Sequence, residues 1–194
     1  MNWVEYAAAA FGVASVYLSA RQNVWNWPLG IINVALYTIV FYDAKLYADM
    51  GLQVVYIVLA AYGWWHWLHG GANRGQLPVS RVSAREAVLL AVAFVLGAAV
   101  LSTLLGRATD ASLPLADSAL TTASLVAQYM MTRKYVECWP VWIVTDVGYV
   151  VMFIYKQLWP TAALYLVFCV FAAVGWHQWR ESLRKRVAGE AVYA

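Results

Sequence analysis

A single carboxylate, Asp146, lies in the middle of an aromatic stretch of the sequence. Trp139, Trp142, Asp146 and Tyr149 follow one another at spacings of 3, 4 and 3 residues, which place all four on one face of a helix. In a helix surrounded by lipid, an ionised Asp costs about 2.5–3.5 kcal/mol, and a Trp face attracts a cation by roughly 0.5–2 kcal/mol. The pattern indicates a desolvated site for a flat cationic ligand, unless Asp146 lies near a wet helix end or bonds to a neighbouring helix.

Other apolar stretches carry amide, phenol and hydroxyl side chains at helical spacing, namely Asn33, Tyr37, Gln53, Thr121, Ser124 and Gln128. Such groups can bind a hydroxylated ligand, or they can form the interhelical hydrogen bonds that are common in membrane bundles. Together with the Asp146 face, we expect four of them to contact a ligand: Asn33, Tyr37, Gln53 and Gln128.

Residue types that are typical of metal sites or of catalysis are sparse. His66 and His69 are three residues apart, but no acidic or cysteine partner is near them in the sequence. The two cysteines, Cys138 and Cys169, match neither a disulfide framework nor a metal spacing. No Gly-rich phosphate loop, ATPase motif or Gly-x-Ser-x-Gly elbow occurs in the sequence. We therefore expect no metal site, no cofactor and no enzymatic activity.

The composition indicates that the helices lie in lipid. Hydrophobic residues make up 63% and charged residues 12% of the 194 positions, whereas soluble domains average roughly 45–50% and about 25%. This excludes both a soluble globular domain and a disordered chain, and it gives no sign of a nucleic-acid partner. Windows long enough to approach or cross a ~30 Å hydrocarbon core cover residues 4–20, 27–42, 50–68, 87–105, 115–131, 139–155 and 159–176. The sequence predicts an all-α integral membrane protein with seven transmembrane helices.

The basic residues set the expected orientation, because short cytoplasmic segments of membrane proteins are rich in Lys and Arg. With the N-terminus outside, ten of the 13 basic residues fall in cytoplasmic segments, and only Lys45, Arg107 and Lys156 fall outside. An odd number of spans then places the C-terminus in the cytoplasm.

The sequence matches itself without a gap when it is shifted by 112 residues. Arg-x-x-Val-x-x-Trp-Pro occurs at 21–28 and 133–140, and Gly-Trp-x-x-Trp occurs at 63–67 and 175–179. Each copy holds three helices, so one linking helix gives a 3+1+3 layout with two parallel repeats. We expect one domain over residues 1–194, with repeat one at about 4–68, the linker helix at about 84–106 and repeat two at about 113–180. Transporters with this plan bind substrate at the repeat interface.

Several short motifs resemble the PnuC family of bacterial vitamin transporters. They are MTRKYVE at 131–137, Trp139-x-x-Trp142, Gly30-Ile-Ile-Asn33-Val, Leu46-Tyr47-Ala48, Leu52-Gln53-Val54 and Tyr62-Gly63-Trp64. The resemblance covers most of residues 15–180. It implies a SWEET-like fold, a bacterial inner-membrane location and passive uptake of nicotinamide riboside without a cofactor, with trapping by a separate kinase. It also implies that Trp139 and Trp142 line and gate the substrate site and that Gln53 contacts substrate.

Two positions depart from the family pattern, because nicotinamide riboside carriers usually have Asn where this sequence has Asp146 and Cys138. Other family members are specialised for thiamine or further nucleoside-like vitamins. Nicotinamide riboside and thiamine both carry a fixed positive charge on an aromatic ring, so Asp146 suits either. We expect facilitated uptake of nicotinamide riboside. The alternatives are thiamine or another cationic vitamin within the family, and a non-transporting membrane scaffold outside it. The expected partners are a small-molecule vitamin, the lipid bilayer and further copies of the chain in a homo-oligomer.

Overall fold

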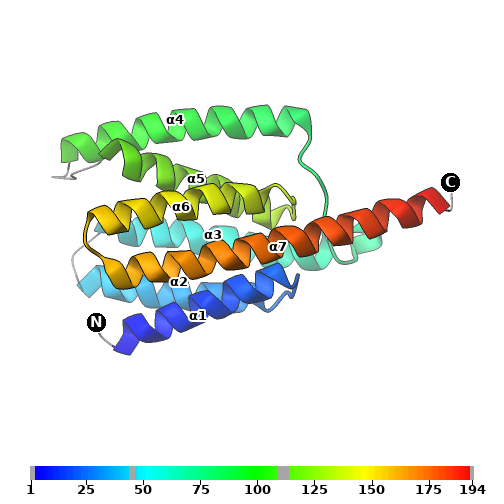
Figure 1. The fold of residues 1–194 in the computed structure, drawn as a ribbon, viewed down its shortest axis with the longest axis horizontal. Coiled ribbons are helices and arrows are strands. Elements are labelled where there is room, and N and C mark those ends of the chain that lie inside the picture. Colours follow the sequence, from blue (N-terminus) through cyan, green and yellow to red (C-terminus); the bar gives the residue numbers. More distant parts are fainter. Residues whose placement is uncertain (1–2, 44–46, 109–113, 193–194) are drawn as a thin grey trace.

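The protein is all-helical in the computed structural model, which describes residues 3–43, 47–108 and 114–192 (Figure 1). The α-helices in this part are α1 (Trp3–Ala20), α2 (Asn26–Asp43), α3 (Tyr47–His69), α4 (Ala84–Ala108), α5 (Pro114–Thr132), α6 (Cys138–Tyr155) and α7 (Trp159–Val192). The predicted all-α class is confirmed. The largest difference from the predicted windows is at α7, which continues past residue 176 because strong helix formers such as Arg, Glu and Leu follow the apolar segment.

Prolines mark the beginnings of several helices. Pro28, Pro114, Pro140 and Pro160 each lie in the first turn of a helix, where the missing N–H leaves no intrahelical hydrogen bond unmade. The connections α1–α2 and α5–α6 are short, and each reverses through one residue with left-handed backbone. These residues are Gln22 and Lys134, both with φ of 56°. The two turns therefore have the same local geometry.

Six helices form a closed ring, and α4 lies outside it. The packed pairs α1–α2, α2–α3, α3–α5, α5–α6, α6–α7 and α7–α1 close the ring, whereas α4 packs mainly against α5 along one edge of the bundle (Figure 1). All the helices run along the length of the bundle. The interior of the ring is therefore enclosed by helices from both halves of the chain.

Three helices in the described part are long and apolar enough to cross a membrane by themselves, through the segments Ala84–Leu104, Cys138–Tyr155 and Trp159–Gly189. Two shorter apolar segments are Tyr6–Ala20 and Asn26–Val40. On α4, large side chains such as Val88, Val95 and Leu96 are exposed. Exposing such an apolar surface to water is unfavourable in free energy, so this face is suited to contact with lipid tails. The protein is therefore a membrane protein.

The two ends of the bundle differ in charge. One end holds the α1–α2 and α5–α6 turns, the α3–α4 connection and the protruding end of α7, and we call it the basic end (Figure 1). It gathers the ten basic residues that the sequence places together: Arg21, Arg74, Arg81, Arg85, Arg133, Lys134, Arg180, Arg184, Lys185 and Arg186. The opposite end, called the far end, holds Lys156 between α6 and α7 and Arg107 in the last turn of α4. Lys45 lies outside the described residues.

Candidate substrate-binding site

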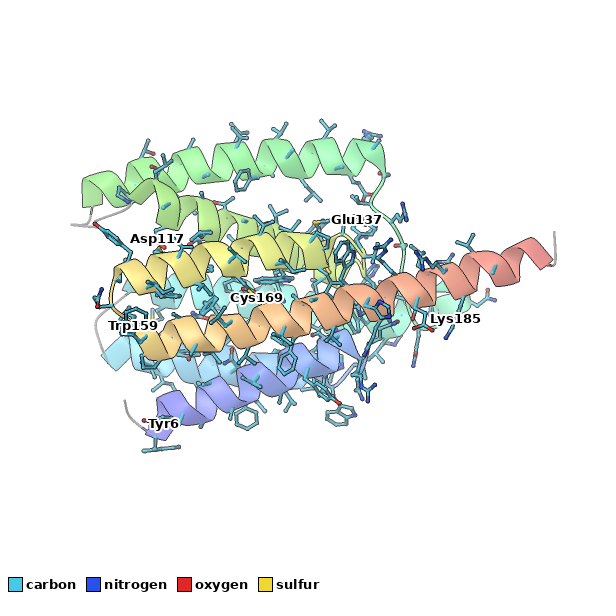
Figure 2. All side chains as sticks on the ribbon, viewed as in Figure 1. Tyr6, Asp117, Glu137, Trp159, Cys169 and Lys185 are labelled. Carbon is cyan, nitrogen blue, oxygen red and sulfur yellow. The ribbon has the colours of Figure 1, made fainter. Side chains whose placement is uncertain are left out.

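A cavity of about 770 Å³ lies inside the six-helix ring, within the usual range of small-molecule sites. Every ring helix contributes lining residues, whereas the described residues of α4 contribute none. Asp117, which lines the cavity, is in the first turn of α5 at the far end of the bundle, and Glu137 lies just before α6 at the basic end (Figure 2). We call this space the main cavity.

All eight side chains predicted from the sequence line the main cavity, and so do Thr121 and Ser124. The eight are Trp139, Trp142, Asp146, Tyr149, Gln53, Asn33, Tyr37 and Gln128. The two histidines lie elsewhere: His66 stacks on Tyr62 with ring centres 5.4 Å apart, and His69 Nδ1 is 3.0 Å from the Trp65 carbonyl oxygen. Within the described residues, no group of His, Cys, Asp and Glu could hold a metal ion.

The Asp146 carboxylate is buried and has no basic partner. The residue is only 4% exposed, and no ion pair in the described part of the chain involves it. Its surroundings are aromatic: Tyr149 packs against Tyr165 at 5.0 Å between ring centres, and Phe153 packs against the same Tyr165 ring at 5.1 Å. A buried carboxylate needs a compensating charge or hydrogen bonds, and a cationic ligand in the main cavity would supply the charge.

The polar side chains of the cavity divide into committed and available groups. Asn33 Nδ2 donates to the Ala8 carbonyl at 2.6 Å, and the Ser124 hydroxyl donates to the Leu120 carbonyl of its own helix at 2.9 Å. These bonds agree with the alternative that such groups form hydrogen bonds within the helix bundle. The amides of Gln53 and Gln128 line the cavity and form no hydrogen bond with another described residue, so they are free for a ligand.

The charged side chains that line the main cavity are acidic. Asp117 and Asp146 line it, and none of its lining residues within the described part is Lys, Arg or His. Asp117 was not among the predicted site residues, because an acid in the first turn of a helix is common and favourable there for its own sake. Tyr56 and Tyr165, which reach the cavity from α3 and α7, were not among them either. Only the closing of the ring reveals that these helix faces meet.

Four tryptophans close the ring toward the basic end. Trp27 meets Trp67 and Trp139 meets Trp179, each pair with ring centres 5.2 Å apart and planes at 87°, and Trp67 lies 5.7 Å from Trp179. We call these four side chains the tryptophan cluster. Gly63 and Gly175 make room for it, because a Cβ at either position would overlap the indole of Trp27 or Trp139.

The indole N–H groups of the tryptophan cluster fall into two classes. Trp67 Nε1 donates to the Met131 carbonyl at 3.0 Å, and Trp179 Nε1 donates to the Ser19 carbonyl at 3.1 Å. Trp27 Nε1 and Trp139 Nε1 are buried and have no hydrogen-bond partner among the described residues, and both residues line the main cavity. Trp27 was not among the predicted site residues, although its alignment with Trp139 in the shifted sequence was the signal that could have found it.

Comparisons with known proteins agree with this picture. A family model described as nicotinamide mononucleotide transporter matches residues 2–181. The chain is 28% identical over 211 residues to the nicotinamide riboside transporter PnuC of Escherichia coli (strain K12), covering 96% of this chain and 88% of the relative. It is 27% identical to the protein of the same name from Neisseria mucosa, covering 97% and 76%.

A second vitamin appears among the relatives, and one solved structure has the same fold. The riboflavin/roseoflavin transporter RibM of Streptomyces davaonensis is 26% identical over 147 residues, covering 74% of this chain and 68% of the relative. The crystal structure of the vitamin B3 transporter PnuC superposes with a TM-score of 0.75 at 24% identity, covering 94% of this chain and 83% of that one. The chain belongs to the nicotinamide mononucleotide transporter family, which includes the PnuC transporters.

Proposed function

We propose that this protein is a membrane transporter that takes up nicotinamide riboside by facilitated diffusion. The observation that carries the proposal is the main cavity, which is enclosed by six helices, lined by aromatic rings and two carboxylates, and lined by no basic residue of the described part. Trp142 and Tyr149 would stack on the cationic ring, and Asp146 would balance its charge. Trp139 would border the ligand from the tryptophan cluster. Gln53, Gln128 and Tyr37 would contact the polar part of the ligand. Asn33 would do so through its Oδ1, because its Nδ2 donates to Ala8.

The charge of the cavity favours a riboside over a mononucleotide. A phosphate group adds about −1.5 to −2 charges at pH 7, and like charges in a buried site repel strongly. Asp117 and Asp146 would meet that phosphate without any basic side chain among the described lining residues. Thiamine remains the second candidate, because Asp146 suits any flat aromatic cation, whereas riboflavin, the cargo in the name of RibM, lacks the positive charge.

The architecture that we propose has seven transmembrane helices in a 3+1+3 layout, with two parallel repeats joined by α4. Several contacts support a twofold relation along the bundle. Trp67 donates to Met131, Trp179 donates to Ser19, and the members of the two bonds are 112 positions apart. The ring order α1–α2–α3–α5–α6–α7 also maps onto itself when each half replaces the other. The exposed face of α4 leaves room for the expected homo-oligomer.

The proposed orientation is N-terminus outside and basic end in the cytoplasm of a bacterial inner membrane. The gathering of ten basic residues at one end supports it. In a background with Cys169→Ser, the remaining Cys138 is fully buried. A cysteine introduced at Arg74 should then react only with reagents that reach the cytoplasm, and one introduced at Lys156 should react from outside. Labelling of the Arg74 position from outside intact cells would contradict the orientation.

A ligand panel tests the substrate. The detergent-purified protein is heated with nicotinamide riboside, thiamine, riboflavin or nicotinamide mononucleotide, and the Tm is recorded. A ligand at 100 times its Kd adds about 2.7 kcal/mol of stability, or about 5–10 °C in a chain of this size. We expect nicotinamide riboside to give the largest Tm shift of the four ligands, and we expect Asp146→Asn to reduce that shift. A shift with riboflavin but not with either cation would contradict the proposal, and no shift with any of the four would favour a scaffold.

A further inference from the structure

A second cavity of about 210 Å³ lies at the basic end and shares no lining residue with the main cavity. Its polar walls come from Gln22 and Asn23 of the α1–α2 turn, Gln76 of the α3–α4 connection and Lys134 of the α5–α6 turn, and Trp67 forms an apolar wall. A water molecule occupies roughly 30 Å³ of liquid, so this space admits a small ligand. We call it the basic-end cavity.

Lys134 brings a buried cation to this cavity without an acidic partner. The residue is 6% exposed, and its Nζ donates to the Leu77 carbonyl at 2.9 Å and lies 4.5 Å from the centre of the Trp67 ring. An ammonium group has three donors, so two remain for a ligand. Within the described residues, no carboxylate lies within ion-pair distance of it.

The neighbouring carboxylates are already engaged. Glu137 Oε2 accepts a hydrogen bond from the Val82 N–H at 3.1 Å, and Glu86 accepts one from the Tyr135 hydroxyl at 2.7 Å while lying 4.0 Å from Arg133. Burial alone, without a nearby charge, lowers the pKa of Lys134 to about 8. Because buried charges in proteins are normally paired, this ammonium group is available to an anion.

The backbone holds Lys134 in place whether or not a ligand is bound. Its φ of 56° is left-handed, a conformation that residues other than glycine seldom adopt. The α3–α4 connection fixes the turn, since Ser80 N donates to the Lys134 carbonyl at 3.1 Å and Val136 N donates to the Ser80 carbonyl at 3.0 Å. Asn23, which also lines the cavity, accepts a hydrogen bond from Trp25 N through its Oδ1. This bond leaves the Asn23 amide N–H groups for a ligand.

We propose that the basic-end cavity binds a phosphate-type anion, either inorganic phosphate or a phosphate monoester, with Lys134 as its charged contact and the amides of Asn23 and Gln76 as further donors. Phosphate offers three acceptor oxygens and more than one negative charge, which match several donors around one cation. The site does not depend on which vitamin the protein carries. In the proposed orientation it faces the cytoplasm, and Trp67, which lines it, packs against Trp27 and Trp179 of the tryptophan cluster.

The test measures the Tm of the purified protein against inorganic phosphate at constant ionic strength, and in a second arm against nicotinamide mononucleotide. Phosphate at ten times its Kd should raise the Tm by about 3–6 °C, with a saturating dependence on concentration. Lys134→Gln should weaken the phosphate affinity at least tenfold, and Lys134→Arg should restore most of it. Arg74→Gln, a charge change at an exposed site of the same end, is the matched control and should leave the affinity unchanged.

Gln76→Glu keeps the test decisive if the Lys134 variants fold poorly, because Gln76 is exposed and lines the cavity. The added carboxylate should abolish the phosphate shift, while Gln76→Ala should weaken it only about twofold. A non-saturating shift of equal size in the wild type, Lys134→Gln and Gln76→Glu would show only general salting-out and contradict the proposal. A mononucleotide shift that is larger than the phosphate shift, is lost in Lys134→Gln and is kept in Asp146→Asn identifies the monoester as the ligand of the basic-end cavity. A mononucleotide shift that Lys134→Gln leaves intact would place the monoester in the main cavity and contradict the assignment, and the shift with nicotinamide riboside reports separately on the main cavity.

Discussion

The two three-helix units, α1–α3 and α5–α7, hold matching scaffolds but contribute different side chains to the main cavity. The scaffold pairs Trp27–Trp67 and Trp139–Trp179 have the same ring distance and angle. Among cavity-lining positions 112 apart, the N-terminal unit has the smaller or less polar residue at Ala9/Thr121, Gly12/Ser124, Val16/Gln128, Gly30/Trp142 and Val34/Asp146. At these five pairs, α5 and α6 supply the larger, polar or charged side chains, whereas α1 and α2 leave space. The N-terminal unit adds its own polar contacts elsewhere, through Asn33, Tyr37 and Gln53.

The largest expected effect is the loss of Trp142. Replacing Trp142 by Ala removes a ring face, and base–aromatic stacking is worth roughly 1–3 kcal/mol per base. We expect the Kd for nicotinamide riboside to rise about 5- to 150-fold, measured by ligand-induced Tm shifts over a concentration series. Trp65→Ala, at an exposed position that does not line the cavity, is the control. Unchanged affinity in a folded Trp142→Ala protein would place the ligand elsewhere.

A smaller effect is expected at Asp146, whose counterpart in the N-terminal unit is the uncharged Val34. Asp146→Asn keeps the shape and deletes the charge, so binding of a cationic vitamin should weaken about tenfold. From the family resemblance we expect Asn at this position in nicotinamide riboside carriers, so nicotinamide riboside should tolerate the change better than thiamine. Val34→Ala, the counterpart in the N-terminal unit, should change the Kd less than twofold. Equal losses from both variants would contradict the asymmetry between the units.

The scaffold, in contrast, should respond equally in both units. Trp67→Phe and Trp179→Phe each remove one indole donor from a main-chain carbonyl, which keeps only its backbone donor, Lys134 N or Gln22 N. The loss of one hydrogen bond costs about 0.5–1.5 kcal/mol beyond the lost ring volume. Trp27→Phe loses a similar volume but no hydrogen bond. Thermal unfolding should therefore rank Trp67→Phe and Trp179→Phe together, about 1–6 °C below Trp27→Phe. A large difference between the first two would argue against matching scaffolds.

The smallest effect concerns the turns, where Gln22 and Lys134 are counterparts with the same φ. The folded pKa of Lys134, about 8, lies below the ordinary 10.5, so the unfolded chain binds more protons between these values. The free energy of unfolding should then rise with pH above about 8, by about 1 kcal/mol between pH 7 and 9. Denaturation of Lys134→Gln should lack this rise, and Gln22→Ala should keep it. A pH profile that Lys134→Gln does not alter would show another group titrating.

Periodicity and composition predicted the helices and much of the site. The apolar windows located all the helices, and the spacing of Trp139, Trp142, Asp146 and Tyr149 correctly placed them on one cavity face. These features are local, because one helix face is set by residues three and four apart. The role of Asp146 as a contact for a cationic ligand stays a prediction.

Features that depend on packing between distant helices could not be predicted. Asp117 and Tyr165 look like ordinary helix residues until α5 and α7 close the ring. Asn33 was read as a possible ligand contact, and only the structure shows that its amide also holds α1 through Ala8. Lys134 was counted as one of the basic residues of a turn, and its burial follows from the α3–α4 connection folding over it.

The central claim, that the main cavity carries a cation and excludes its phosphorylated form, is tested most directly by flux into proteoliposomes. Labelled nicotinamide riboside and labelled nicotinamide mononucleotide are offered separately to liposomes that contain the purified protein. The account predicts saturable riboside uptake that stops at equal concentrations on both sides, is slowed by Trp142→Ala, and has no saturable counterpart for the mononucleotide. Saturable mononucleotide flux equal to or faster than that of the riboside would contradict it.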